Sequence, residues 1–204
     1  MGIDWGFANP FSALWSQVTD DKTVFVDDEL YGTEKHPAQW GELMAKKNRD
    51  RNVTLALGDP SMWARNPMAW NSPETSAYTD SSIADCLGDY LPSLMKANNS
   101  RVNGWNNMAQ LMHFTEDTIP SFYIIKGTCP NLIRTIPDMI RCDKNPEDID
   151  TTLEDHAVDS CRYMLSHITA PSKPKKKRTY LQKQKDELMW EERQTPGHWS
   201  YNWS

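Results

Sequence analysis

Hydrophobic and polar positions alternate in three short segments at the beginning of the chain. These segments, GIDWGF, SALWSQV and TVFVDDELY, lie within residues 2–31. They are separated by Ala8-Asn9-Pro10 and by Thr19-Asp20-Asp21-Lys22, which are typical turn sequences. The pattern predicts a meander of three antiparallel strands.

The period then changes to that of a helix. From about Pro37 to Asn48, Trp40, Leu43 and Met44 keep one side apolar. The next segment, NVTLALGDP, is apolar almost without alternation, which is typical of a central strand covered on both faces. Further helices are expected near residues 82–97, 104–114 and 130–140, with a strand SFYII before the last of them. The alternation of strands and helices predicts an α/β fold.

The last apolar stripe follows Asn145-Pro146. Thr151 and Glu154 form a possible capping box ahead of the helix, whose apolar positions are Leu153, Ala157, Cys161 and Met164. Asp155, His156 and Asp159 fall beside this stripe, and acidic residues four positions apart oppose helix formation unless a positive charge compensates them. We therefore expect a cation near this helix.

The composition changes at about residue 170. We expect a domain over residues 1–170 and a basic, largely flexible tail over residues 171–204. The formal net charge is −6, and the tail segment KPKKKR contributes five positive charges, so the remainder carries −11. Such an acidic body would not hold DNA through a general basic field, and a nucleic-acid role would need local patches, metal ions or a partner that delivers the DNA.

Several common classes of protein are disfavoured. The four cysteines contain no C-x-x-C pair, which argues against a zinc site or a disulfide scaffold and fits a reducing cytosol. No apolar run approaches the length of about 18 residues that a membrane span needs. The chain shows no signal peptide, and Met1 leads directly into an expected strand, so we expect the sequence to be a piece of a longer protein.

Three carboxylates occupy positions that suit a shared site. Asp4 lies in the first strand, Asp59 at the carboxyl end of the central strand, where α/β sheets gather their sites, and Asp159 on the last helix. Carboxylates without cysteine ligands favour hard cations such as Mg²⁺ or Mn²⁺. The alternative is that Gly58-Asp59-Pro60 is only turn chemistry.

The strings GIDWG, LALGDPSMW, KANNSRVNGWNNMAQLM and CPNLIRTIPDMIRCDKNPEDIDTTLEDHAVDSCRYML together resemble the C-terminal nuclease domain of a bacteriophage large terminase subunit. The resemblance runs in order from residue 2 to about residue 168. It implies a ribonuclease H-like fold, in which a central mixed sheet, with an antiparallel meander and then parallel strands, is flanked by helices.

The resemblance also implies an activity, namely metal-dependent cleavage of concatemeric viral double-stranded DNA during genome packaging in the host bacterial cytoplasm. Asp4, Asp59 and Asp159 are inferred to bind two Mg²⁺ or Mn²⁺ ions, with Asp155 as an outer or alternative ligand. His156, in the H-x-x-D spacing, is inferred to move protons or position water. The expected partners are DNA, the portal, the small terminase subunit and an ATPase domain of the same protein, since this sequence has no G-x-x-x-x-G-K-[ST] loop.

Two other functions stay open. A junction resolvase of the same fold would prefer branched DNA, and a docking module for the portal or small terminase would have no divalent-dependent cleavage. The candidate DNA contacts are the basic residues of KKNRDR, of the loop after Asp59 that also holds Trp63 and Trp70, and of the tail: Lys46, Lys47, Arg49, Arg65, Lys175, Lys176 and Lys177. For KKNRDR the alternative is a solvated face that compensates the helix dipole, for the loop it is packing, and for the tail it is a contact with the portal.

Overall fold

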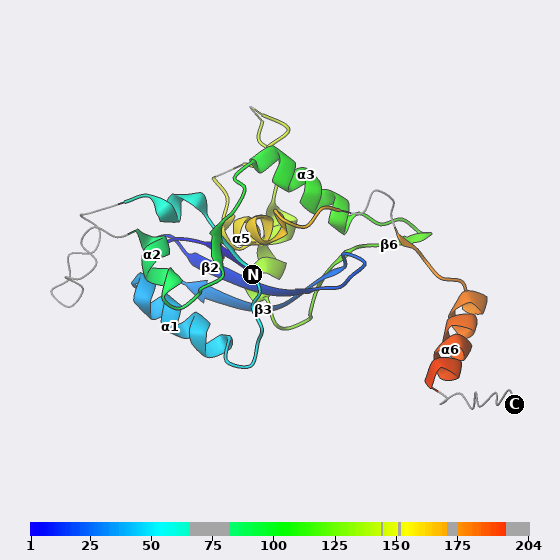
Figure 1. Ribbon diagram of the computed structural model, residues 1–204. Coiled ribbons are helices and arrows are strands. Elements are labelled where there is room, and N and C mark those ends of the chain that lie inside the picture. The colour runs from blue at the N-terminus through cyan, green and yellow to red at the C-terminus, as the bar shows by residue number, and fades with distance from the viewer. Residues whose placement is uncertain (66–81, 144, 151, 171–174, 195–204) are drawn as a thin grey trace, which may run out of the picture.

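The computed structural model describes residues 1–65, 82–143, 145–150, 152–170 and 175–194, with side chains described up to residue 187 (Figure 1). Within these residues, no helix combines the length and the apolar character needed to cross a membrane. A mixed sheet occupies the middle of the domain, and helices lie on both of its faces.

The predicted meander is confirmed. Strand β1 (Gly2–Asp4) pairs antiparallel with β2 (Phe11–Val18), and β2 pairs antiparallel with β3 (Val24–Gly32). Strands parallel to their neighbours extend the sheet on both sides, which gives the order β5-β4-β1-β2-β3-β7 with β4 (Ala56–Gly58), β5 (Leu94–Lys96) and β7 (Phe122–Ile124). The apolar NVTLALGDP segment is thus an interior strand, as its lack of alternation predicts, and SFYII forms β7.

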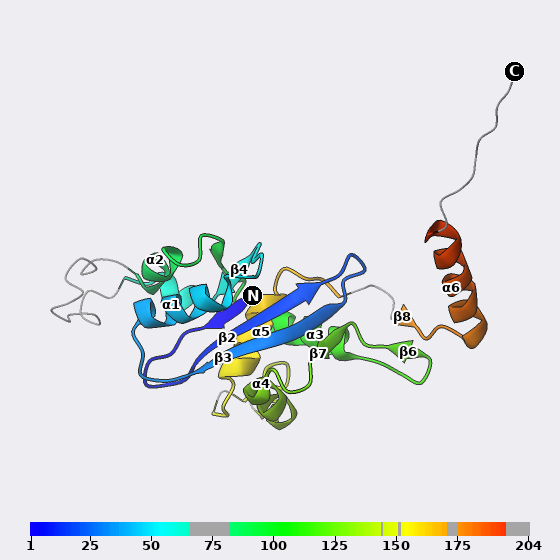
Figure 2. The same ribbon diagram turned by 90° about the horizontal axis from the view of Figure 1, so that it is seen from below.

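The two faces of the sheet carry separate cores. Helices α1 (Pro37–Lys47) and α2 (Ile83–Gly88) cover one face, where Ile3 and Trp40 are buried together. The opposite face carries α3 (Arg101–Met112), α4 (Pro130–Thr135) and α5 (His156–Leu165). Figure 2 shows these two layers on either side of the strands. Because side chains alternate along β1, Asp4 points to the α5 side while Ile3 points to the α1 side.

Helix α5 packs against β1 and β2 at unusually close range. A Cβ atom on Gly2 would lie 2.0 Å from the backbone oxygen of Ser160, so only glycine fits there. The buried hydroxyl of Ser12, on the neighbouring strand β2, hydrogen-bonds to the buried hydroxyl of Ser160 on α5 at 2.8 Å. These small residues let the helix approach the carboxyl end of β1.

Three predicted helices have different bounds. The segment 82–97 forms only α2, and its second half becomes strand β5, because Pro92 cannot donate a helical hydrogen bond and Leu94–Lys96 pairs with β4. The helix predicted at 130–140 ends at Thr135 and continues as a 3₁₀ turn, Ile136–Asp138, around Pro137. Helix α3 begins earlier than predicted, at Arg101.

The start of α5 also differs from the prediction. Asp155 is its N-cap residue, so the predicted capping box of Thr151 and Glu154 does not begin the helix. Thr151 lies outside the described residues. Glu154 instead accepts hydrogen bonds from Arg134 and Tyr31, which hold it away from the backbone of the helix.

The C-terminal segment contains two elements. Strand β8 (Lys175–Lys176) pairs antiparallel with β6 (Thr118–Ile119), and helix α6 (Tyr180–Gln194) follows. In Figure 1 this helix stands apart from the sheet and its covering helices. The flexibility of residues 171–204 and the domain boundary near residue 170 stay predictions.

Candidate active site

Two of the three predicted carboxylates meet at one edge of the sheet. Asp4 is the last residue of β1 and Asp59 directly follows the parallel strand β4. The backbone N–H of Asp59 donates to the carbonyl of Ile3 at 2.9 Å, which continues the pairing up to this edge. The carboxyl ends of parallel strands are the usual place for a site in an α/β sheet.

Helix α5 supplies the remaining groups from one stripe of its surface. His156, Asp159 and Tyr163 are spaced by three and four residues, so they share a face. The His156 Nδ1 atom lies 3.0 Å from Oδ2 of Asp4, and the Tyr163 hydroxyl donates to Oδ1 of Asp59 at 3.3 Å. The helix therefore contacts both strand-end carboxylates.

Asp59 also has the turn role that its Gly-Asp-Pro context indicates. Its carboxylate accepts from the backbone N–H of Ser61 at 2.9 Å and from the Ser61 hydroxyl, and it caps the 3₁₀ turn Pro60–Trp63. The turn fixes the direction of the side chain. Asp59 thus caps a turn and also belongs to the group of carboxylates at this edge of the sheet.

Burial and like charges act together on Asp4. The residue is only 7% exposed, and its pKa is raised to about 7, first by burial and also by the charges of Asp159 and Asp59. The hydrogen bond from His156 opposes this rise, and the same contact raises the pKa of His156. Burial also raises the pKa of Asp155, the half-buried N-cap residue. The edge is short of positive charge, as the sequence of α5 indicates.

Two arginines that the sequence analysis missed provide part of that charge. Asp159 accepts from Nε of Arg162 at 2.9 Å and contacts Nη1 of Arg101 at 3.4 Å. Arg162 is 1% exposed, and its guanidinium lies against the rings of Trp105 and Tyr163. A basic residue three positions after Asp159 on a helix was a readable signal, whereas the contact of Arg101 depends on the tertiary fold.

The donor set suits a hard divalent cation, because it consists of carboxylates around the buried and charge-starved Asp4. In the described part of the chain, however, no three side chains of histidine, cysteine, aspartate or glutamate are grouped closely enough to hold a metal ion. The Asp59 and Asp159 oxygens face serine, tyrosine and arginine donors instead. The arrangement is a carboxylate cluster whose members are held by protein hydrogen bonds.

The predicted DNA contacts are not gathered around these carboxylates. Lys46, Lys47 and Arg49 lie at the end of α1, and Lys47 is paired with Asp28 at 2.7 Å. Helix α1 lies on the face of the sheet opposite α5, and its end lies near the beginning of β1. These three basic residues are therefore far from Asp4, which ends β1. Lys175 is held by Asp21 at 2.9 Å, and Lys176 and Lys177 are exposed beside it. Arg65 ends the described part of the loop after Asp59, and Trp70 lies outside the described residues.

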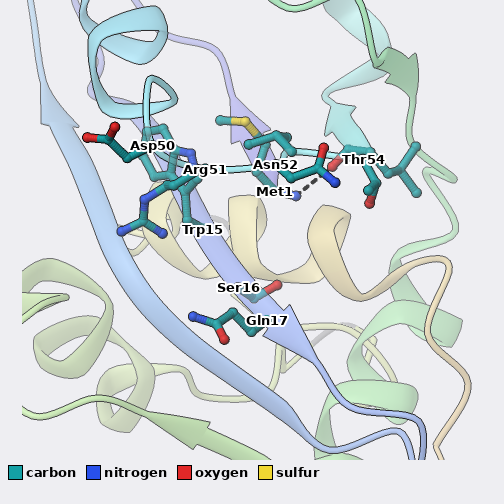
Figure 3. Close-up of a pocket in the computed structure, with 10 residues that line it drawn as sticks. Met1, Trp15, Ser16, Gln17, Asp50, Arg51, Asn52 and Thr54 are labelled. Carbon is teal, nitrogen blue, oxygen red and sulfur yellow. Dashed lines mark hydrogen bonds between the residues drawn. The ribbon is translucent and has the colours of Figure 1, made fainter.

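A cavity of about 290 Å³ lies at the opposite edge of the sheet, between the beginning of β1 and the segment that precedes β4 (Figure 3). Met1, Trp15 and Arg51 are among its lining residues, and Asp4, Asp59 and Asp159 are not. It is thus separate from the carboxylate cluster.

Comparison with solved structures identifies the fold. The chain is similar to the large terminase nuclease domain of bacteriophage SPP1, which was solved with bound Mn: the TM-score is 0.56, the identity 14%, and the match covers 80% of this chain and 82% of that one. The P22 large terminase nuclease domain gives a TM-score of 0.53 and 14% identity, with 82% and 80% covered. No protein-family model and no curated protein matches. The chain has the ribonuclease H-like α/β fold of terminase nuclease domains, as its sequence motifs indicate.

Proposed function

We propose that the protein is a divalent-metal-dependent DNA endonuclease that cuts concatemeric viral DNA during genome packaging. The observation that carries the proposal is the convergence of Asp4, Asp59 and the α5 stripe with Asp159 at the carboxyl edge of the sheet. The fold shared with two terminase nuclease domains supports it, as does the manganese bound to one of them.

Asp4, Asp59 and Asp159 would hold two Mg²⁺ or Mn²⁺ ions, with Asp155 as an additional oxygen donor, once these carboxylates move closer together than they lie in this structure. When bound, such ions activate a water and stabilise the leaving oxygen of a phosphodiester. His156 orients the Asp4 carboxylate through its Nδ1 contact and would relay a proton from the attacking water. Tyr163 and Ser61 fix the direction of Asp59. The two arginines hold the Asp159 carboxylate in position.

The biological setting follows from the same resemblance. The substrate would be double-stranded DNA in the cytoplasm of a bacterial host. The partners would be an ATPase domain of the same protein, the portal and the small terminase subunit. An acidic domain needs a delivered substrate, since its own field repels DNA.

The direct test is cleavage of supercoiled and linear plasmid with Mg²⁺, with Mn²⁺ and with EDTA. We expect metal-dependent cutting by the wild-type protein and a loss of at least roughly 100-fold in Asp4→Asn and Asp159→Asn. Asp20→Asn, at an exposed turn, is the matched control and should retain full activity. Cutting that survives both site substitutions would refute the proposed site.

Two further outcomes identify the other functions. Preference for a four-way junction over linear duplex would indicate a resolvase. Absence of cleavage with every metal, combined with binding to the portal or the small terminase, would indicate a docking module.

A further inference from the structure

Arg101 lies at the same edge of the sheet as Asp4 and Asp59. It is brought there by strand β5 and helix α3, which supply none of the proposed metal ligands. Strand β5 runs parallel to β4, and the N–H of Ala97 donates to the carbonyl of Gly58 at 2.9 Å. The chain after β5 therefore leaves the sheet at the same edge as Asp4 and Asp59. Arg101 follows as the first residue of α3, where the helix dipole adds positive potential.

Other side chains hold one part of the Arg101 guanidinium in place. Its Nε atom lies 3.1 Å from both carboxylate oxygens of Asp148, and its guanidinium carbon is 5.5 Å from the centre of the Trp105 ring. The Trp105 indole N–H donates to the same Asp148 carboxylate at 2.8 Å. The orientation of Arg101 is thus set from one side, before any ligand is present.

The other part of the guanidinium is poorly matched. Nη1 reaches Oδ2 of Asp159 only at 3.4 Å, near the limit for a hydrogen bond, and Nη2 has no hydrogen-bond partner among the described residues. A buried donor without a partner is unfavourable. The side chain of Arg101 is 26% exposed overall but Nη2 is buried, so an anion can reach this donor only when a neighbouring group such as Asp159 moves away.

Asp159 can leave this contact without becoming an uncompensated charge. Its other oxygen, Oδ1, accepts from Nε of the buried Arg162 at 2.9 Å. Gly104 makes room for that arginine, since a Cβ atom there would lie 2.7 Å from Arg162 Cγ. Arg162 therefore remains a partner of Asp159 when the longer contact with Arg101 is broken.

We propose that Arg101 binds a backbone phosphate of duplex DNA beside the carboxylates, and that Asp159 Oδ2 occupies the place of this phosphate while DNA is absent. This inference rests on the proposed function, because it takes DNA as the substrate. Arginine presents a planar fork that matches two phosphate oxygens, as it matches a carboxylate. A second cation favours an extended polyanion: Lys96, at the exposed end of β5, lies 5.5 Å from the centre of the Trp63 ring, which belongs to the turn that Asp59 caps.

The test is DNA binding in EDTA, where cleavage cannot occur, measured by fluorescence anisotropy of a labelled duplex over a range of salt concentrations. We expect Arg101→Gln to bind roughly tenfold more weakly at low salt. The slope of log affinity against log salt should fall in magnitude by about 0.9, the value for one lost phosphate contact. An unchanged affinity and slope would overturn the proposal.

Arg51→Gln is the matched control. Arg51 also contacts two carboxylates, those of Asp27 and Asp28, and is 32% exposed, but it lies at the opposite edge of the sheet (Figure 3). We expect its affinity to stay within about twofold of wild type, because only a distant charge is removed. An equal loss in both variants would show a general charge effect and would overturn the proposal.

A second comparison tests the exchange with Asp159. Asp159→Asn should strengthen DNA binding in EDTA by roughly threefold or more, and this gain should disappear in the Arg101→Gln background. The same gain in both backgrounds would contradict the exchange. If Arg101→Gln unfolds, Arg101→Lys keeps the charge without the fork: a normal salt slope with weakened affinity supports the proposal, and wild-type affinity refutes it.

These results are separate from those of the cleavage test. Failure of the wild-type protein to cut DNA with Mn²⁺ would refute the nuclease function. Failure of Arg101→Gln to weaken binding in EDTA would refute only the phosphate contact.

Discussion

Burial and neighbouring negative charges raise the pKa of Asp4, and this shift makes the stability of the protein depend on pH. Its pKa is about 7 in the folded protein against an ordinary value of 3.8, so the folded state holds a proton that the unfolded chain has lost between these values. The raised pKa of His156 acts in the same direction. The free energy of unfolding of the metal-free protein should therefore fall as the pH rises from about 4 to about 7, by up to about 1.4 kcal/mol per pH unit for Asp4.

Urea denaturation in EDTA across this range measures the effect. Asp4→Asn removes the titrating group, so its stability should depend less on pH. A wild-type stability that rises over the same interval would show that the folded protein binds fewer protons than the unfolded chain, contrary to this expectation.

Arg162 illustrates the difference between a buried and an exposed ion pair. Arg162→Ala leaves Asp159, which is 8% exposed, with only the longer contact to Arg101, and we expect a loss of about 3 kcal/mol in the free energy of unfolding. In the matched variant Arg178→Ala the lost pair with Asp186 is mainly exposed, and the loss should stay below about 1 kcal/mol. Chemical denaturation of both variants decides whether burial makes the difference.

At the scale of the elements, α5 packs closely against β1. In Gly2→Ala the new Cβ would meet the Ser160 backbone oxygen at 2.0 Å, and either the helix or the strand must shift. We expect destabilisation by about 3 kcal/mol. Gly88→Ala is the control, because nothing lies within 4 Å of its added Cβ and alanine favours a helix, so its stability should stay equal or rise by up to about 1 kcal/mol.

Denaturation curves for the two alanine variants provide the comparison. If Gly2→Ala were as stable as wild type, α5 could not lie as close to β1 as the structure places it.

The sequence pattern predicts long or strongly periodic elements well and short ones badly. The meander and α1 are recovered because β2, β3 and α1 each have several residues of one period, and β4 is recovered because it lies within the longer apolar run NVTLALGDP. Strand β5 has three residues, which are too few to show an alternation, and the preceding α2 made the whole segment 82–97 look helical.

That error also concealed part of the site. The positions of Asp4, Asp59 and Asp159 follow from strand ends and helix spacing, which are local features. Arg101 reaches the same edge only because β5 is parallel to β4, and a helix at 82–97 gives no reason to place it there. Tyr163 lies seven residues after His156, so the helical period alone could have indicated it.

At the scale of the whole molecule, charge is divided between an acidic domain and a basic C-terminal segment. Removing residues 171–204 should weaken duplex binding, because eight basic and four acidic residues, a net charge of +4, are lost, and should leave Mn²⁺ binding unchanged. The fold should survive, since the pairing of β8 with β6 involves only two residues on each strand. Anisotropy with DNA and calorimetry with Mn²⁺ measure the two affinities.

A triple glutamine variant of the full chain distinguishes the loss of charge from the loss of the segment itself. It replaces Lys175, Lys176 and Lys177. This variant should reproduce most of the loss in DNA affinity. Undiminished DNA binding by the truncated protein would assign the segment another role.

The contact of Gly2 with Ser160 has a consequence for how sequences of this fold can diverge. Two chains with 14% identity can share the sheet and its helices, because most positions only need the right polarity and size. Position 2 has no room for a side chain, and the buried, hydrogen-bonded positions of Ser12 and Ser160 have room only for small residues. Natural variation should therefore be narrowest at these chemically inert positions, where selection preserves the spacing between the acidic groups rather than the groups themselves.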